Sequence, residues 1–158
     1  MKTILIALDY NPTAQKIAET GYELAQSMNA QTILMHVVAD YTYYSSLDYS
    51  PIMGFDQFSN LGAMQIDSSL ELEKAANEYL EKTRTHLGDT SIKTLVKDGD
   101  TGDAILEAAE NLDADLIVLG SHSRRGLDKI LMGSVAEKVL RHSKTPLFII
   151  PISEKDND

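Results

Sequence analysis

The residues between Gly120 and Ser134 combine glycine, serine and basic side chains in a pattern that suits the binding of a phosphate group. Gly120 opens this segment, and Gly133 and Ser134 close it just before a run with helical spacing. Glycine lets the backbone approach an anion closely. The free N–H groups and the dipole at the start of a helix both favour negative charge there. We therefore expect Gly120, Gly133, Ser134 and Val135 to lie against phosphate.

Basic side chains gather in the same part of the chain. Between Gly120 and Lys144 there are six basic and two acidic residues, a net charge of +4, so the rest of a chain with formal charge −10 carries −14. A positive island in an acidic protein suits a small anionic ligand, and His122, Ser123 and Arg124 are the expected side-chain contacts. Charge alone favours a simpler interpretation, in which these residues are the solvated faces of a helix and a loop. The coincidence with the glycines favours the anion site.

Composition narrows the class of protein. With 158 residues, 43% hydrophobic and 24% charged, the chain has the size and composition of one globular domain. The charge of −10 argues against nucleic acid or an anionic membrane as partner. The absence of cysteine excludes disulfides, thiol nucleophiles and thiolate metal sites. The opening MKTILIALDY lacks the pattern of a secretory signal, and we expect a cytoplasmic protein.

Apolar runs and helical periodicities alternate along the chain, which predicts an α/β fold with one doubly wound parallel sheet. Residues 1–152 form the predicted domain and residues 153–158 a polar tail. The predicted strands are Thr3–Leu8, Thr32–Val38, Ile92–Val96, Asp115–Leu119 and Leu147–Ile150.

Each predicted helix has a recognisable start or stop. Asn11 followed by Pro12 predicts an N-cap and a first helical position. Ser134 with Glu137 predicts a capping box for a helix that runs to His142. The remaining helices are expected over residues 66–87, ended by Gly88, and over Thr101–Leu112.

Ligands of doubly wound sheets bind beyond the carboxyl ends of the strands, where the strand order reverses. Asp9 follows the first predicted strand, where it either meets the ligand or caps the turn into Asn11. His36 lies within a buried run and is either a packed, hydrogen-bonded histidine or a ligand contact. Asp100 and Asp103 are expected to serve turn and helix-capping roles.

One long segment interrupts the alternation. Residues Asp40–Asp67 hold six of the ten aromatic residues of the chain. A disordered linker would be poor in aromatic residues, so the segment is expected to fold against something. Three roles are open for this segment: it could cover an edge of its own domain, form a lid over the ligand, or contact another subunit.

The run DLIVLGSHSRRGLDKILMGSVAEKVLRHSKTPLFIIP resembles the C-terminal signature of the universal stress protein family, with its G-x2-G-x9-G-[S/T] nucleotide loop. The opening ILIALDYNPTAQKIA, the central HVV and the segment GDTGDAIL match in the same order. The resemblance covers essentially the whole chain. It implies a Rossmann-like fold, similar to the adenine nucleotide alpha hydrolases, with strand order 3-2-1-4-5.

The resemblance also implies a ligand and a partner. The ligand would be ATP or a related adenine nucleotide, with any Mg²⁺ carried by the phosphates. Gly120, Gly133 and Ser134 would hold the phosphates, while the ribose and adenine would meet five residues: Ala7, Leu8, Asp9, Val37 and Leu119. The partner would be a second copy, paired through Pro146–Pro151. This chain departs from the family pattern at Ser123, where the loop has its second glycine.

The expected function is a regulatory or signalling role in a stress response, acting through a bound adenine nucleotide and an unknown protein partner. The alternative is a nucleotide-free dimeric interaction module of the same fold, acting through Asp40–Asp67. A Walker-type GxxxxGK[ST] motif is absent, and no Ser–His–Asp arrangement or base for activating water is recognisable. Hydrolysis of ATP would therefore be weak and incidental.

Overall fold

Five parallel strands form one sheet in the order β3-β2-β1-β4-β5. The computed structural model describes residues 1–38, 68–121 and 132–152 of the chain. The strands are β1 (Thr3–Ala7), β2 (Gln31–Val38), β3 (Lys93–Asp98), β4 (Leu116–Gly120) and β5 (Leu147–Ile150). The predicted fold class and strand order are confirmed, and the strand boundaries differ from prediction by at most two residues.

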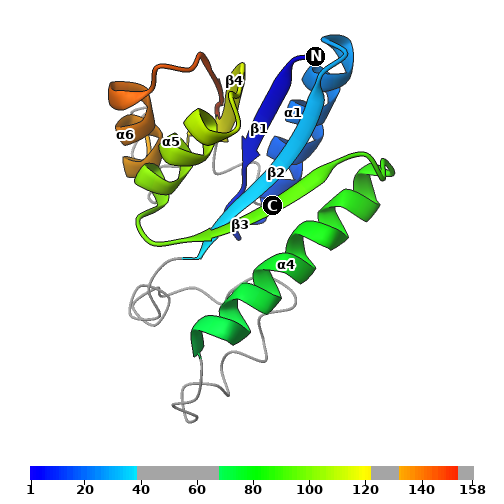
Figure 1. The fold of residues 1–158 in the computed structure, drawn as a ribbon, viewed down its shortest axis with the longest axis vertical. Helices are drawn as coiled ribbons and strands as arrows, with labels where there is room; N and C mark the ends of the chain where they lie inside the picture. The colour runs from blue at the N-terminus through cyan, green and yellow to red at the C-terminus, as the bar shows by residue number, and fades with distance from the viewer. Residues whose placement is uncertain (39–67, 122–131, 153–158) are drawn as a thin grey trace.

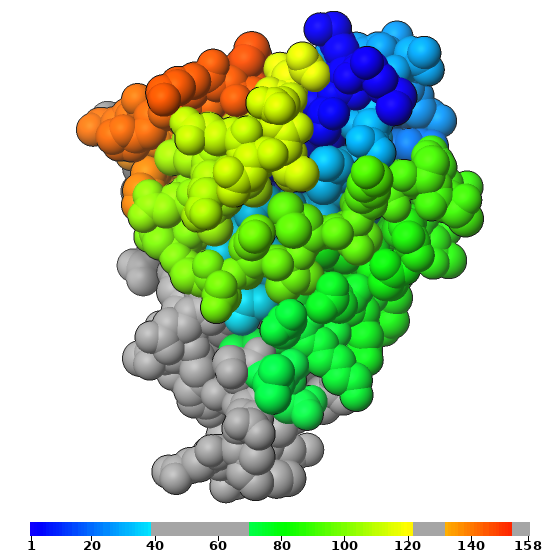
Figure 2. All heavy atoms as spheres, viewed as in Figure 1, coloured from blue at the N-terminus to red at the C-terminus, as the bar shows by residue number. Residues whose placement is uncertain are grey.

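Four helices within the described residues connect these strands and cover both faces of the sheet (Figure 1). Helices α1 (Ala14–Ser27) and α4 (Ser68–Leu87) lie on one face, and α5 (Thr101–Asn111) and α6 (Ser134–His142) on the other. In the space-filling view, the orange surface of α6 adjoins the yellow-green surface of α5 (Figure 2). Among the described residues, no helix has the length and apolar character needed to cross a membrane.

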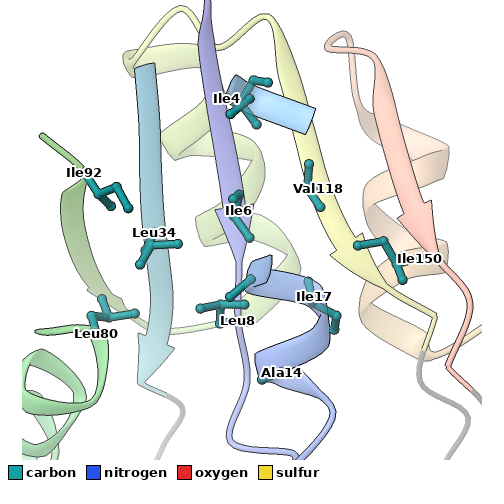
Figure 3. Close-up of a cluster of buried hydrophobic side chains, with 12 residues drawn as sticks. Ile4, Ile6, Leu8, Ala14, Ile17, Leu34, Leu80, Ile92, Val118 and Ile150 are labelled. Atoms are coloured by element: carbon teal, nitrogen blue, oxygen red, sulfur yellow. The ribbon is translucent and has the colours of Figure 1, made fainter. Parts of the chain in front are cut away.

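Alternate residues of the inner strands pack into two separate cores, one on each face. From β1, Ile4 and Ile6 face α1 and α4, whereas Leu5 faces α5 and α6. All three side chains are fully buried, as expected for a strand covered on both faces. The core beneath α1 and α4 includes the side chains in Figure 3, among them Leu8, Leu34 and Val118.

Helix α1 begins later than the sequence predicts. Asn11 was expected to cap the helix, but its Oδ1 accepts hydrogen bonds from the N–H and hydroxyl of Thr13, at 3.0 and 2.7 Å. The N–H of Ala14 then donates to Asn11 O, which closes a separate turn before the helix. The N-cap is therefore Thr13, and the predicted cap at Asn11 is wrong. The physical reason is that the Asn11 side chain accepts from Thr13, two residues ahead, and so forms a local turn instead of capping the helix.

Helix α1 crosses close to the sheet at Gly21. A Cβ atom on this residue would lie 2.8 Å from Ile6 Cδ1 and 3.1 Å from Val118 Cγ1. Both side chains belong to central strands and are fully buried. The absence of a side chain at Gly21 is therefore what allows the helix to approach β1 and β4.

Helix α6 has the predicted bounds but a different cap. Gly133 is its N-cap, with φ −59° and ψ 156°, and Ser134 is the first helical residue. The predicted capping box of Ser134 and Glu137 does not form, because Ser134 lies one position too late to cap the helix. The Glu137 carboxylate instead accepts a hydrogen bond from Arg141 at 2.7 Å, one turn further along.

Candidate functional site

The strand order reverses between β1 and β4, which are neighbours in the sheet but distant in sequence. The chain proceeds outward from β1 through β2 to β3, then returns to β4 on the other side of β1. Ile6 lies opposite Val118 in this pair, so Ala7 and Leu119 follow at the carboxyl edge. This is the place where ligands of such sheets bind.

Four of the residues predicted to contact a ligand share one apolar cluster on the α5 and α6 face. Val37 and Leu119 are buried there, and Ala7 and Val135 are partly buried against the same cluster. Three strands, near their carboxyl ends, and the first turn of α6 thus contribute to one apolar cluster. Leu8 is different, because its side chain packs into the opposite core.

The first turn of α6 has no side-chain oxygen at its N-cap, since that residue is Gly133. Helix α5 provides the contrast, because Asp100 is its N-cap and accepts a hydrogen bond from the N–H of Asp103 at 3.0 Å. The capping role predicted for Asp100 is confirmed. Ser134 is exposed beside Gly133, so the start of α6 presents a hydroxyl and helical N–H groups. Such a helix start favours an anion.

Asp9 lies exposed just beyond β1. Its Oδ1 accepts the N–H of Asn11 at 2.9 Å, so the predicted role in capping the turn into Asn11 is confirmed. A carboxylate accepts hydrogen bonds from hydroxyl groups as well as from backbone N–H groups. Asp9 therefore has the chemistry to accept hydroxyl groups at the carboxyl edge of the sheet.

His36 is packed and hydrogen-bonded, which was one of its two predicted roles. It is 4% exposed, and its Nδ1 lies 2.7 Å from Leu8 O. A carbonyl only accepts hydrogen bonds, so Nδ1 carries the proton. Burial lowers the pKa of His36 to about 4, partly opposed by its hydrogen bond to Leu8 and the charge of Asp9. The imidazole is therefore neutral at pH 7.

Sequence reasoning missed the contribution of Tyr79 to this region. Its hydroxyl, which projects from α4, donates to Asp9 O at 2.8 Å. Burial raises its pKa, with a smaller contribution from the negative charge of Asp9, so the hydroxyl remains a donor. The sequence showed Tyr79 only as an inward-facing position of a helix. A tyrosine that packs against a core usually finds a partner for its hydroxyl, but the sequence does not say which one.

Three predicted phosphate contacts, His122, Ser123 and Arg124, lie outside the described residues, as do the segment Asp40–Asp67 and the polar tail. Within the part of the chain that the structure describes, no group of three or more His, Asp or Glu side chains is placed to hold a metal ion.

Comparison with known proteins decides the family. The sequence model of the universal stress protein family matches residues 1–151. The chain belongs to this family. Universal stress protein A homolog 1 of Coxiella burnetii is 32% identical over 157 residues, which cover 97% of this chain and 98% of the relative.

Solved structures of universal stress proteins share the fold. The protein MJ0577 of Methanocaldococcus jannaschii is 25% identical with a TM-score of 0.70, and 97% of each chain is covered. A universal stress protein in complex with cAMP is 21% identical with a TM-score of 0.59, covering 94% of this chain and 95% of its own. A family member from Arabidopsis thaliana with AMP bound is 18% identical with a TM-score of 0.61, covering 99% and 95%. These structural similarities support the Rossmann-like architecture.

Proposed function

We propose that this universal stress protein binds an adenine nucleotide between the carboxyl ends of β1 and β4. The observation that carries the proposal is the switch point of the sheet: Asp9 directly follows β1, and the glycine-capped α6 is the helix that comes after β4, the neighbour of β1 across the reversal in strand order. The two groups have complementary tasks in holding a nucleotide. A carboxylate accepts the hydroxyls of a ribose, and a helix start with a glycine cap receives phosphate oxygens.

Related structures support an adenine nucleotide as the ligand. One universal stress protein has been solved in complex with cAMP, and the Arabidopsis thaliana protein with AMP bound. Both ligands contain adenine, ribose and phosphate. Within the apolar cluster of the α5 and α6 face, Val37 and Leu119 lie near the carboxyl ends of β2 and β4, where an adenine ring would be accommodated.

In this proposal, each group of predicted residues takes one part of the ligand. Asp9 accepts the ribose hydroxyls, and Ala7, Leu8, Val37 and Leu119 line the base and ribose through side chains or backbone. The backbone and hydroxyl groups of Gly120, Gly133, Ser134 and Val135 receive the phosphates, joined by His122, Ser123 and Arg124. A Mg²⁺ ion would enter with the phosphates of ATP. Binding would serve a regulatory role in a stress response, by selecting between partners rather than by turning over the nucleotide.

Isothermal titration of the purified chain with AMP and with Mg-ATP tests the proposal. Binding of either nucleotide is expected, and the absence of heat at high micromolar protein would overturn it. Gly133→Arg places a long side chain over the start of α6 and should abolish binding. Ser27→Arg adds the same side chain at the exposed end of α1 and should leave binding unchanged. Equal affinity in Gly133→Arg and wild type would place the ligand elsewhere.

We further propose that two copies pair through Pro146–Pro151, as the family resemblance predicts. β5 is an edge strand of the described sheet, and Phe148 on it is 39% exposed. An edge strand carries backbone groups that a second strand can pair with. Sedimentation should give the mass of a dimer, and Phe148→Glu should shift it toward monomer. A monomeric wild type at micromolar concentration would overturn this pairing and, with it, the nucleotide-free dimeric module as the alternative function.

A further inference from the structure

The chain leaving β1 is held by side chains from two other elements. The carbonyl of Leu8 accepts the His36 Nδ1–H group from β2 at 2.7 Å. The next carbonyl, that of Asp9, accepts the Tyr79 hydroxyl from α4 at 2.8 Å. A backbone bond from Leu8 N to Met35 O at 2.8 Å continues the pairing with β2 past the end of the strand. Two successive carbonyls are thus fixed from different directions.

The rings that supply these donors pack together. The centroids of Tyr10 and His36 lie 4.0 Å apart, and Tyr79 meets the two rings edge-on at 5.1 and 6.0 Å. We call Tyr10, His36 and Tyr79 the aromatic clasp. Edge-on contacts at these separations are favourable and restrict ring rotation. The clasp therefore holds both donors in place as well as supplying them.

Hydrogen bonding in the clasp is directed at the backbone. With its proton on Nδ1, His36 leaves Nε2 as a bare acceptor that is buried and has no hydrogen-bond partner among the described residues. Burial of a polar atom without a partner is unfavourable, and an apolar side chain would fill the same space without that cost. What an apolar side chain cannot do is donate to Leu8 O. The geometry thus favours a role in fixing the chain over simple packing.

We propose that Tyr79 and His36 are positioning residues of the nucleotide site, which fix the backbone at Leu8 and Asp9 and thereby hold the Asp9 carboxylate toward the ligand. The inference rests on the proposed function, because Asp9 is the group through which the clasp would act. Neither positioning residue needs to touch the ligand. A site held in its bound geometry before the ligand arrives loses less conformational freedom on binding, which strengthens affinity.

The Tyr79→Phe substitution tests the inference with little change in packing. It removes only the hydroxyl that donates to Asp9 and retains the ring of the clasp. The matched control is Tyr22→Phe, which removes a hydroxyl on α1 that donates to Asp89 at 2.7 Å. Titration with AMP should show affinity about fivefold weaker in Tyr79→Phe, the value of one ordinary hydrogen bond, and unchanged affinity in Tyr22→Phe.

A double-mutant cycle with Asp9→Ala separates positioning from a general effect on stability. Asp9→Ala retains the carbonyl that Tyr79 contacts but removes the carboxylate that the clasp presents. If Tyr79 acts through that carboxylate, Tyr79→Phe should cause no further loss of AMP affinity in the Asp9→Ala background. Losses that multiply fully would overturn the inference.

His36 provides a second measurement through a conservative substitution. The side-chain amide of His36→Asn can still donate to Leu8 O, whereas His36→Leu cannot. AMP affinity should therefore be near that of wild type in His36→Asn and severalfold weaker in His36→Leu, with folding of each checked by circular dichroism. If His36→Leu does not fold, the Tyr79 cycle alone decides.

The outcomes distinguish the two proposals. Equal AMP affinity in wild type and Tyr79→Phe, with weakened binding in Asp9→Ala, would overturn the clasp and leave the nucleotide site standing. No binding of AMP or Mg-ATP by the wild type would overturn the nucleotide site and, with it, the positioning role.

Discussion

Lys138 of α6 reaches the N-terminus of α5, where its Nζ lies 2.9 Å from Asp100 Oδ1. The same carboxylate oxygen accepts the N–H of Asp103 at 3.0 Å, so it caps α5 and joins it to α6. Both interactions lower the pKa of Asp100, the backbone hydrogen bond more strongly. This ion pair therefore joins α6, whose first turn is the proposed phosphate site, to the N-terminus of α5.

Removal of this cap should destabilise the fold measurably. Asp100→Ala should lower the free energy of unfolding by about 1 kcal/mol, because the N–H of Asp103 loses its acceptor. Asp103→Ala is the matched control, since it loses a contact to the same Lys138 but retains the cap. Its exposed ion pair should contribute less than the cap. Urea denaturation of the three proteins measures the difference, and equal losses would contradict the assignment.

Gly21→Ala should destabilise the protein despite the higher helix propensity of alanine. The added Cβ would meet the buried Ile6 Cδ1 at 2.8 Å, and overpacking of this kind costs about 1–3 kcal/mol. Gly102→Ala is the comparison, because its Cβ would lie 2.7 Å from Cδ of Lys138, a flexible and partly exposed side chain that can move. Chemical denaturation should therefore show a clear loss only for Gly21→Ala. An unchanged midpoint would mean that α1 shifts freely on the sheet.

Acid should destabilise the wild type more than a His36→Asn variant between pH 6.5 and 4. The folded-state pKa of His36 is lowered to about 4 from the ordinary 6.5. As the pH falls through this window the unfolded chain takes up the proton first, so stability is present above pH 6.5 and lost progressively toward pH 4. The limit of the loss is about 3 kcal/mol. Charges common to both proteins, including Asp9, largely cancel in the comparison. Parallel stability curves would contradict a buried, neutral imidazole.

Saturating AMP should raise the melting temperature of the wild type. A ligand at about 100 times its dissociation constant adds about 3 kcal/mol to the folded state, which corresponds to several degrees for a chain of this size. Gly133→Arg should melt at the same temperature with and without AMP. If AMP raised the melting temperature of Gly133→Arg as much as that of the wild type, the nucleotide would not bind at the start of α6.

The strands and their burial were predictable because the local sequence and the fold agree. From Ile4 to Ala7 every residue is apolar, which predicts a strand that is covered on both faces. The structure buries alternate residues of this strand under the helices of the two faces. Helix starts were predicted less well, at Asn11 and at Ser134. Capping depends on which N–H group a side chain meets, so a shift of one or two residues moves the cap without altering the pattern of apolar positions.

The sequence by itself determined the family, the order of elements and the placement of Ala7, Val37 and Leu119 near the carboxyl edge of the sheet. These follow from motifs, hydrophobic periodicity and the handedness of parallel crossovers, all of which are encoded locally. Only the tertiary structure decided that Tyr79, 70 positions beyond Asp9, donates to its carbonyl. A contact of this kind depends on the docking of α4 against the end of β1, and no local pattern in the chain specifies where two distant side chains will meet.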